Sequence, residues 1–135
     1  LKQKLKKRPL TIVGNGNQKR DFINVKDVAN AFYKSLNKKV NNVTLNIGFG
    51  KPKSVNFLSK LIGGEKTFLP KRPGEPFITH ADIKKAKKIL KWSPTILLAE
   101  GIQEVLENIE YWKNATLWDK KKIKKATKNW FKYLR

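Results

Sequence analysis

The sequence has no cysteine, no methionine and only one histidine among its 135 residues. Without cysteine the chain can form neither a disulfide framework nor a thiolate metal site, and a single histidine argues against a zinc site. The chain also begins with Leu1 instead of an initiator methionine. We therefore expect a fragment of a longer protein, without a metal ion of its own.

Long apolar runs are absent as well. No stretch approaches the roughly 20 apolar residues needed to cross a bilayer, and no hydrophobic segment follows the basic first eight residues. We expect no membrane span and a cytoplasmic, soluble protein. The length suffices for one compact domain, or part of one, but is short for a cofactor domain together with a substrate domain.

Acidic residues are scarce. The sequence has ten aspartates and glutamates but 31 lysines and arginines, so its formal net charge is +21. Such an excess is typical of nucleic-acid binders, which gain affinity by releasing counterions from phosphate backbones. However, only four of the cations are arginine, the residue favoured for bidentate contacts, and the lysines are spread along the whole chain. We expect a solvated lysine-rich surface, with nucleic acid not the expected partner. A basic non-catalytic module that binds nucleic acid or an anionic surface is the alternative function.

Short β-branched runs alternate with amphipathic patterns of helical period. Strands are predicted at 10–13, 20–23, 43–47 and 66–69, and helices at 25–36, 55–62, 83–90, 96–112 and 120–134. Asn24, Ser54 and Asp82 stand where N-caps belong. A few short strands with about five helices predict a small α/β piece that completes a larger fold. We divide it into a lobe over residues 1–112 and a basic amphipathic helical tail over 113–135, whose apolar stripe we expect to pack on the same protein.

Several polar motifs receive structural interpretations. The Gly14–Asn17 stretch lacks the third glycine of a dinucleotide loop and favours a hairpin turn. Gly48–Lys51 lacks the spacing of a P-loop. His80 has no catalytic partners, and Glu100, Glu104 and Glu107 share one helix face and are expected to be solvated helix charge.

Arginine is so rare in this lysine-rich chain that Arg20 and Arg72 stand out as cations that lysine cannot replace. Arg20 follows the Gly14–Asn17 turn, and Arg72 lies in a proline-rich loop that ends at Pro76. Two guanidinium groups could clamp a diphosphate through charge-assisted hydrogen bonds. Alternatively, each pairs with a nearby acid such as Asp21 or Glu75.

Five segments, in this order and spacing, resemble the C-terminal portion of the extended short-chain dehydrogenase/reductases. These sugar-nucleotide epimerases and dehydratases include the UDP-glucose 4-epimerase-like proteins that the chain is most similar to. The segments are Pro9-Leu-Thr-Ile-Val-Gly-Asn-Gly16, Gln18-Lys-Arg-Asp-Phe-Ile-Asn-Val-Lys-Asp-Val28, Leu45-Asn-Ile-Gly-Phe-Gly50, Lys71-Arg-Pro-Gly-Glu75 and Ala81-Asp-Ile-Lys-Lys-Ala-Lys-Lys-Ile-Leu-Lys-Trp92. The resemblance covers about residues 5–109. It implies the substrate-binding lobe of a Rossmann-type fold whose N-terminal NAD-binding domain is missing here.

The resemblance also implies roles for single residues. Arg20 and Arg72 are expected to contact the diphosphate of a nucleotide sugar, a UDP-sugar above all, and Glu75 to hydrogen-bond its ribose. Asp21 and Asp27 are expected to hold the local fold, and Asp82 to cap its helix. The parent enzyme is expected to use NAD and to be a homodimer.

The family's glycine-rich NAD loop and its Tyr-x-x-x-Lys pair are both absent from the sequence. Tyr33 and Tyr111 are followed at the fourth position by Asn37 and Ala115, and Tyr133 is too near the end of the chain. We therefore expect no catalytic and no cofactor-binding residue in this chain. We expect it to be inactive alone.

Overall fold

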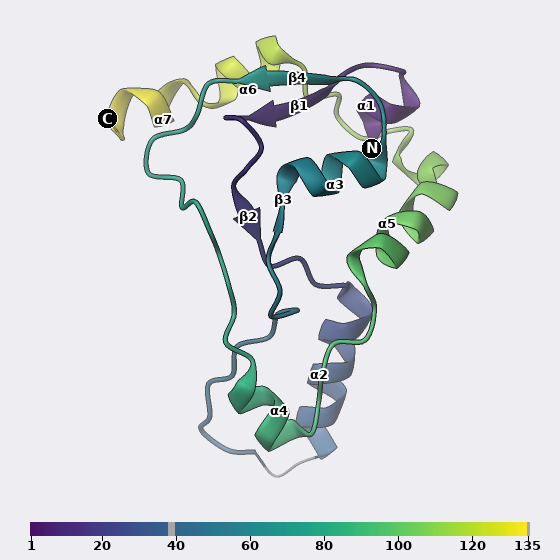
Figure 1. Ribbon diagram of the computed structural model, residues 1–135, viewed down its shortest axis with the longest axis vertical. Helices are drawn as coiled ribbons and strands as arrows, with labels where there is room; N and C mark the ends of the chain where they lie inside the picture. Colours follow the sequence, from purple (N-terminus) through teal and green to yellow (C-terminus); the bar gives the residue numbers. More distant parts are fainter. Residues whose placement is uncertain (38–39, 135) are drawn as a thin grey trace.

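The computed structural model describes residues 1–37 and 40–134 as an elongated α/β structure (Figure 1). In chain order, its elements are α1 (Lys2–Leu5), β1 (Leu10–Val13), β2 (Lys19–Arg20), α2 (Val25–Asn37), β3 (Lys53–Ser54), α3 (Val55–Ile62), β4 (Lys66–Leu69), α4 (Lys84–Leu90), α5 (Leu98–Glu107), the 3-10 turn η1 (Ile109–Trp112), α6 (Lys120–Ala126) and α7 (Lys128–Tyr133). The strands lie in the upper half of Figure 1, with α6 and α7 beside β1 and β4, while α2 and α4 form the lower half. This arrangement confirms the predicted α/β lobe with few short strands.

The strands form two separate two-stranded sheets in the described part of the chain. β1 runs parallel to β4, with Leu10 opposite Lys66, and β2 runs antiparallel to β3. The predicted hairpin is therefore wrong, because β1 and β2 do not pair with each other. The turn between them carries the chain from one sheet to the other.

Contacts with α3, rather than a cross-strand ladder, hold this turn. The Gly16 carbonyl accepts the amide of Asn56, whose side chain donates to the Asn15 carbonyl. Gly16 has a φ of +77°, and a Cβ built there would lie 2.3 Å from Asn56 Oδ1. The glycine is therefore needed both for the left-handed backbone and for the close approach of α3.

Two strand predictions need correction. Residues 43–47 form no strand, although the alternating pattern predicted one; Leu45 and Ile47 instead pack against the core as part of an irregular segment. The strand predicted at 20–23 is found only at Lys19–Arg20. Alternation shows which side chains face the protein, but a strand also needs a neighbouring backbone to pair with. Residues 43–47 pair with no strand in the part of the chain that the structure describes.

A compact core lies between α2 and α4. Its fully buried members, Ala31, Ala86, Leu90 and Trp92, are surrounded by partly buried aliphatic side chains. Trp92 also donates its indole N–H to the carbonyl of Asp27 at 3.1 Å. The segment that ends α4 is thereby fixed to the first turn of α2.

Most helix boundaries follow the predicted signals. The side chains of Asn24 and Ser54 accept amides of the first turns of α2 and α3, as capping residues do. α4 begins at Lys84, one residue later than predicted, so its N-cap position is Ile83 and not Asp82. The Asp82 side chain still accepts the amide of Lys84, the first residue of the helix. The helix predicted at 96–112 is divided into α5 and η1, and the helix predicted for the tail breaks at Thr127.

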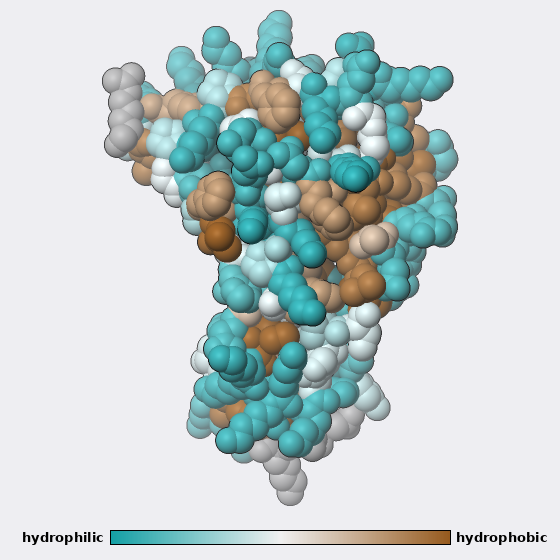
Figure 2. Space-filling model, viewed as in Figure 1, coloured by the Kyte–Doolittle hydropathy of each residue, from teal (hydrophilic) through white to brown (hydrophobic). Residues whose placement is uncertain are grey.

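Three large apolar side chains of α2 do not face the core. Val25, Phe32 and Leu36 are 76%, 69% and 84% exposed, whereas the side of the helix toward α4 carries Asp27 and Ala31. Figure 2 shows a largely hydrophilic surface with a further apolar area over α3 and α5, where Leu61 and Leu106 line a shallow hollow. The periodicity correctly predicted an amphipathic helix, but its apolar face has no partner among the described residues.

Candidate nucleotide-sugar site

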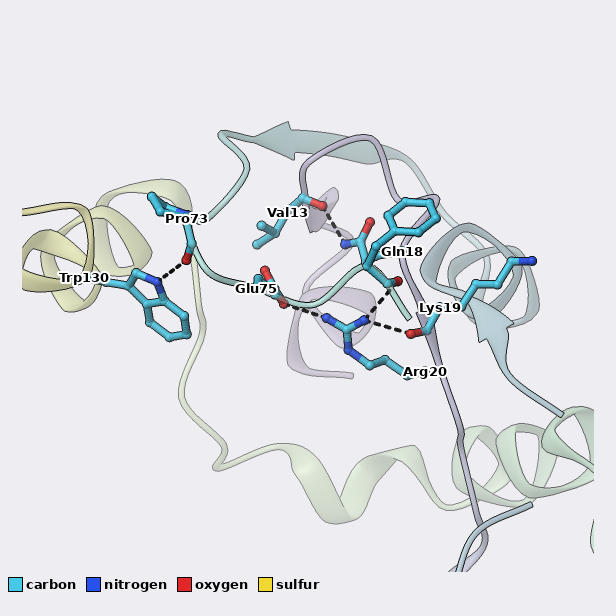
Figure 3. Close-up of polar contacts among 8 residues, drawn as sticks. Val13, Gln18, Lys19, Arg20, Pro73, Glu75 and Trp130 are labelled. Atoms are coloured by element: carbon cyan, nitrogen blue, oxygen red, sulfur yellow. Dashed lines mark hydrogen bonds and ion pairs between the residues drawn. The ribbon is translucent and has the colours of Figure 1, made fainter. Parts of the chain in front are cut away.

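Arg20 and Glu75 meet at the centre of the candidate site. Arg20 ends β2, and Glu75 lies in the loop of residues 70–76 that follows β4 (Figure 3). Arg20 Nη2 lies 3.1 Å from Glu75 Oε1, and the two side chains are 24% and 23% exposed. Arg20 Nη1 also donates to the carbonyl of Lys19 at 2.8 Å. The ion pair joins two motifs that the resemblance had singled out separately.

Beside this pair lies a hollow of about 270 Å³, called the loop hollow here. Its wall consists of Val13, Gly14, Asn15, Gln18, Lys71, Glu75, Pro76 and Phe77. Gln18 is fixed on that wall, since its side-chain amide donates to the Val13 carbonyl at 2.7 Å. Polar groups from the turn after β1 and from the 70–76 loop therefore converge on one open space, with Lys71 adding positive charge.

Arg72 lies in a different hollow from Glu75. It lines a groove of about 610 Å³, called the tail groove, together with Val13, Phe68, Leu69, Pro70, Lys120, Ile123, Lys124, Thr127, Lys128 and Phe131. Its guanidinium carbon lies 5.5 Å from the centre of the Trp130 ring in α7. Trp130 Nε1 donates to the Pro73 carbonyl at 2.8 Å (Figure 3). No hydrogen bond or ion pair of the Arg72 side chain exists within residues 1–37 and 40–134.

The predicted site residues are thus brought together only in part. Arg20 and Glu75 touch, and Arg72 belongs to the same loop as Glu75 but has its cationic group against α7. The alternative interpretation, that each arginine pairs with a nearby acid, holds for Arg20, whose partner is Glu75 and not Asp21. It does not hold for Arg72 within the described residues, where the guanidinium lies over the Trp130 ring instead.

Asp21 organises the backbone around the site. Its carboxylate accepts the amides of Phe49, Gly50 and Ala81 at 3.0 to 3.2 Å. A Cβ on Gly48 would lie 2.6 Å from Asp21 Oδ2, so the glycine lets the chain pass close to the carboxylate. The predicted structural role of Asp21 is confirmed.

The other polar residues of the sequence also have structural partners. Asp27 is buried and accepts three hydrogen bonds from Thr95 and Ile96. His80 Nε2 lies 3.0 Å from the Gly50 carbonyl. The three glutamates of α5 make local or surface contacts: Glu100 with the Leu97 amide, Glu104 with Lys26 and Glu107 with Gln103.

Sequence reasoning missed Trp130 and Gln18 as members of the site. The helical period of the tail predicts one apolar stripe, made of Ile123, Ala126, Trp130, Phe131 and Leu134. Only the indole N–H of Trp130 indicates that this residue needs a polar partner when it packs. In the structure Ile123 and Phe131 of that stripe line the tail groove together with Thr127, whereas Trp130 contacts the 70–76 loop. The tail does pack on its own protein, as predicted.

The described residues include no group of three or more His, Asp or Glu side chains placed to hold a metal ion. None of their helices combines the length and hydrophobicity that a bilayer crossing requires. Tyr33, Tyr111 and Tyr133 are all exposed and lack a lysine four positions on.

Comparisons with known proteins agree with the geometry. The model of the NAD dependent epimerase/dehydratase family matches residues 1–48. A UDP-glucuronate 4-epimerase from Thermodesulfobacterium geofontis is 38% identical over 76% of this chain and 35% of its own length. UDP-glucuronic acid decarboxylase 1 from Xenopus tropicalis is 33% identical over 77% of this chain and 26% of its own length.

The fold is also found among solved structures. UDP-glucuronic acid 4-epimerase from Bacillus cereus, solved with UDP-glucuronic acid and NAD, superposes with a TM-score of 0.75 and 35% identity. The match covers 82% of this chain and 38% of that enzyme. The chain spans about a third of the length of the relatives it matches, and the matched part is C-terminal. Together the five motifs, the α/β lobe and these matches show that the chain belongs to the NAD dependent epimerase/dehydratase family, of which it represents the C-terminal part.

Proposed function

We infer that this chain is the substrate-binding lobe of an NAD-dependent nucleotide-sugar epimerase or dehydratase, similar to UDP-glucose 4-epimerase. The observation that carries the proposal is the meeting of Arg20 and Glu75, 55 residues apart in sequence, beside the loop hollow. The substrate is a nucleotide sugar, with a UDP-sugar favoured. The relatives include both 4-epimerases and a decarboxylase, so the proposal covers the family's substrate class and not one reaction.

Arg20 and Arg72 would supply the cationic groups for the diphosphate. A guanidinium donates up to five N–H groups in a planar fork that matches phosphate oxygens. Arg20 donates to the carbonyls of Lys19 and Phe77 and to the carboxylate of Glu75. The Arg72 side chain makes no hydrogen bond within the described residues. Glu75 would accept a ribose hydroxyl with its carboxylate, which is acceptor-only when ionised.

NAD and the catalytic pair would come from the upstream domain. NAD would supply hydride chemistry in the parent enzyme. This chain would bind and orient the nucleotide half of the substrate. The exposed apolar face of α2 supports such a partner. Burying a side chain like Phe32 or Leu36 contributes about 1.5–3 kcal/mol, so this face would stabilise a domain interface. A homodimer of the parent enzyme belongs to the same proposal.

Isothermal titration with UDP and UDP-glucose tests the proposal. Arg20→Lys and Arg72→Lys keep the charge but lose the planar fork, so each should weaken UDP binding by about tenfold or more, since a charge-assisted hydrogen bond contributes about 1.5–3 kcal/mol. Arg8→Lys, an exposed arginine outside the site, is the matched control and should bind as the unaltered protein does. Equal affinity for all four proteins would contradict the assigned roles.

The net charge of +21 favours a second candidate function, a module that binds polyanions. A second titration tests this candidate. Duplex DNA is titrated at about 50 and 200 mM salt. A polyelectrolyte binder should lose a large factor of affinity over that range and be indifferent to Arg20→Lys. A nucleotide-sugar lobe should instead prefer UDP-glucose over bulk polyanion and respond to the lysine variants.

A further inference from the structure

The C-terminal tail holds the loop that carries the predicted phosphate ligand. Trp130 makes two contacts with consecutive residues of that loop: its ring lies 5.5 Å from the Arg72 guanidinium carbon, and its N–H donates to the Pro73 carbonyl. One contact fixes a side chain and the other fixes the backbone next to it. Figure 3 shows the indole beside Pro73, on the opposite side of Glu75 from Arg20.

Trp130 belongs to α7, and α6 and α7 pack against the lobe through their apolar residues. Ile123, Thr127 and Phe131 line the tail groove opposite Phe68 and Leu69 of β4. Thr127 Oγ1 donates to the Ile123 carbonyl at the break between the two helices. The indole is therefore carried by a helix that is itself seated against the lobe.

The contact with Trp130 leaves the hydrogen-bonding groups of Arg72 available. The guanidinium carbon lies 5.5 Å from the centre of the Trp130 ring, within the range of a cation–π contact, and this contact restricts where the cation can lie. Because the Arg72 side chain donates to no group within the described residues, its N–H groups are unused there. An orientation obtained before the ligand arrives lowers the entropic cost of binding.

We propose that Trp130 is a positioning residue that orients Arg72 for an oxyanion of the nucleotide diphosphate. This inference rests on the proposed function for the identity of the ligand. The contact between Trp130 and Arg72 can be measured without any ligand. The basic helical tail is then part of the substrate site.

The first test measures UDP affinity of the 135-residue protein and its variants. Trp130→Leu should weaken UDP binding roughly 3- to 10-fold, the effect expected for a partly exposed cation–π contact. Trp130→Phe keeps an aromatic face but loses the N–H donor, and should recover most of the loss. Tyr133→Leu removes an exposed aromatic ring from the same helix and should have no effect. In an Arg72→Ala background, Trp130→Leu should cause no further loss.

The second test needs no ligand. The side-chain protons of Arg72 should be shifted upfield in the NMR spectrum by the indole ring, partly so in Trp130→Phe, and should return to ordinary values in Trp130→Leu. Full UDP affinity in Trp130→Leu, or unshifted Arg72 protons in the unaltered protein, would overturn the inference. If the unaltered protein does not bind UDP but the Arg72 protons are shifted, the proposed function fails while the Trp130–Arg72 contact is supported.

Discussion

Asp27 is the residue whose loss should most damage the fold. It is 3% exposed and accepts the Thr95 amide, the Thr95 hydroxyl and the Ile96 amide, all at 3.0 to 3.1 Å. Its own carbonyl accepts the indole N–H of the buried Trp92. One residue in the first turn of α2 therefore holds the segment that follows α4, and we predict that Asp27→Ala separates the two.

The expected cost follows from the three lost hydrogen bonds. Bonds to a charged acceptor contribute about 1.5–3 kcal/mol each when buried. Thr95 is exposed and can be rehydrated, so we use about 1 kcal/mol per bond and expect a loss of about 3 kcal/mol. That is a large part of the roughly 5–15 kcal/mol by which a domain is stable. Asp27→Asn keeps one acceptor oxygen but places an NH₂ group, itself a donor, opposite the N–H and O–H donors of Thr95 and Ile96. It should lower the free energy of unfolding by about 1–2 kcal/mol.

Urea denaturation followed by tryptophan fluorescence measures the effect, because Trp92 lies beside Asp27. Asp82→Asn is the control: Asp82 accepts one exposed amide hydrogen bond from Lys84, so this change should lower the free energy of unfolding by less than about 0.5 kcal/mol. A loss below about 1 kcal/mol for Asp27→Ala with an unchanged m-value would refute the reasoning. It would mean that water replaces the carboxylate without cost.

Three further predictions concern the turn, a helix cap and the exposed face. Gly16→Ala should lower the free energy of unfolding by about 1–3 kcal/mol, measured by urea denaturation, because the methyl group meets Asn56 and the backbone has a positive φ; an unchanged midpoint would contradict the close approach. Ser54→Ala should cost about 1 kcal/mol through loss of the cap on α3, whereas Ser54→Asp should be nearly neutral in the same assay. The double change Phe32→Ser, Leu36→Ser should alter stability by less than about 0.5 kcal/mol per site and reduce self-association in sedimentation velocity; a large destabilisation would show that these side chains pack within the lobe.

Local features of the fold could be predicted from the sequence because their causes lie within a few residues. Asn24 and Ser54 cap the helices that follow them, and each side chain accepts an amide of the first turn. The glycines of the turn after β1 follow from backbone preference in the same way, since Gly14 and Gly16 have positive φ. The family motifs identified the lobe because five of them occur in the right order.

Only the tertiary structure decided which segments meet. Strand alternation could not show that β1 pairs with β4, nor that residues 43–47 pair with no strand among the described residues, since pairing depends on a distant backbone. Helical periodicity predicted the apolar face of α2 but not that this face is exposed. The Arg20–Glu75 ion pair and the Trp130–Pro73 hydrogen bond span 55 and 57 residues. Contacts at such separations depend on packing that no local pattern encodes. The sequence could therefore name Arg20, Arg72 and Glu75, but only the fold showed that Trp130 contacts Arg72 and Pro73.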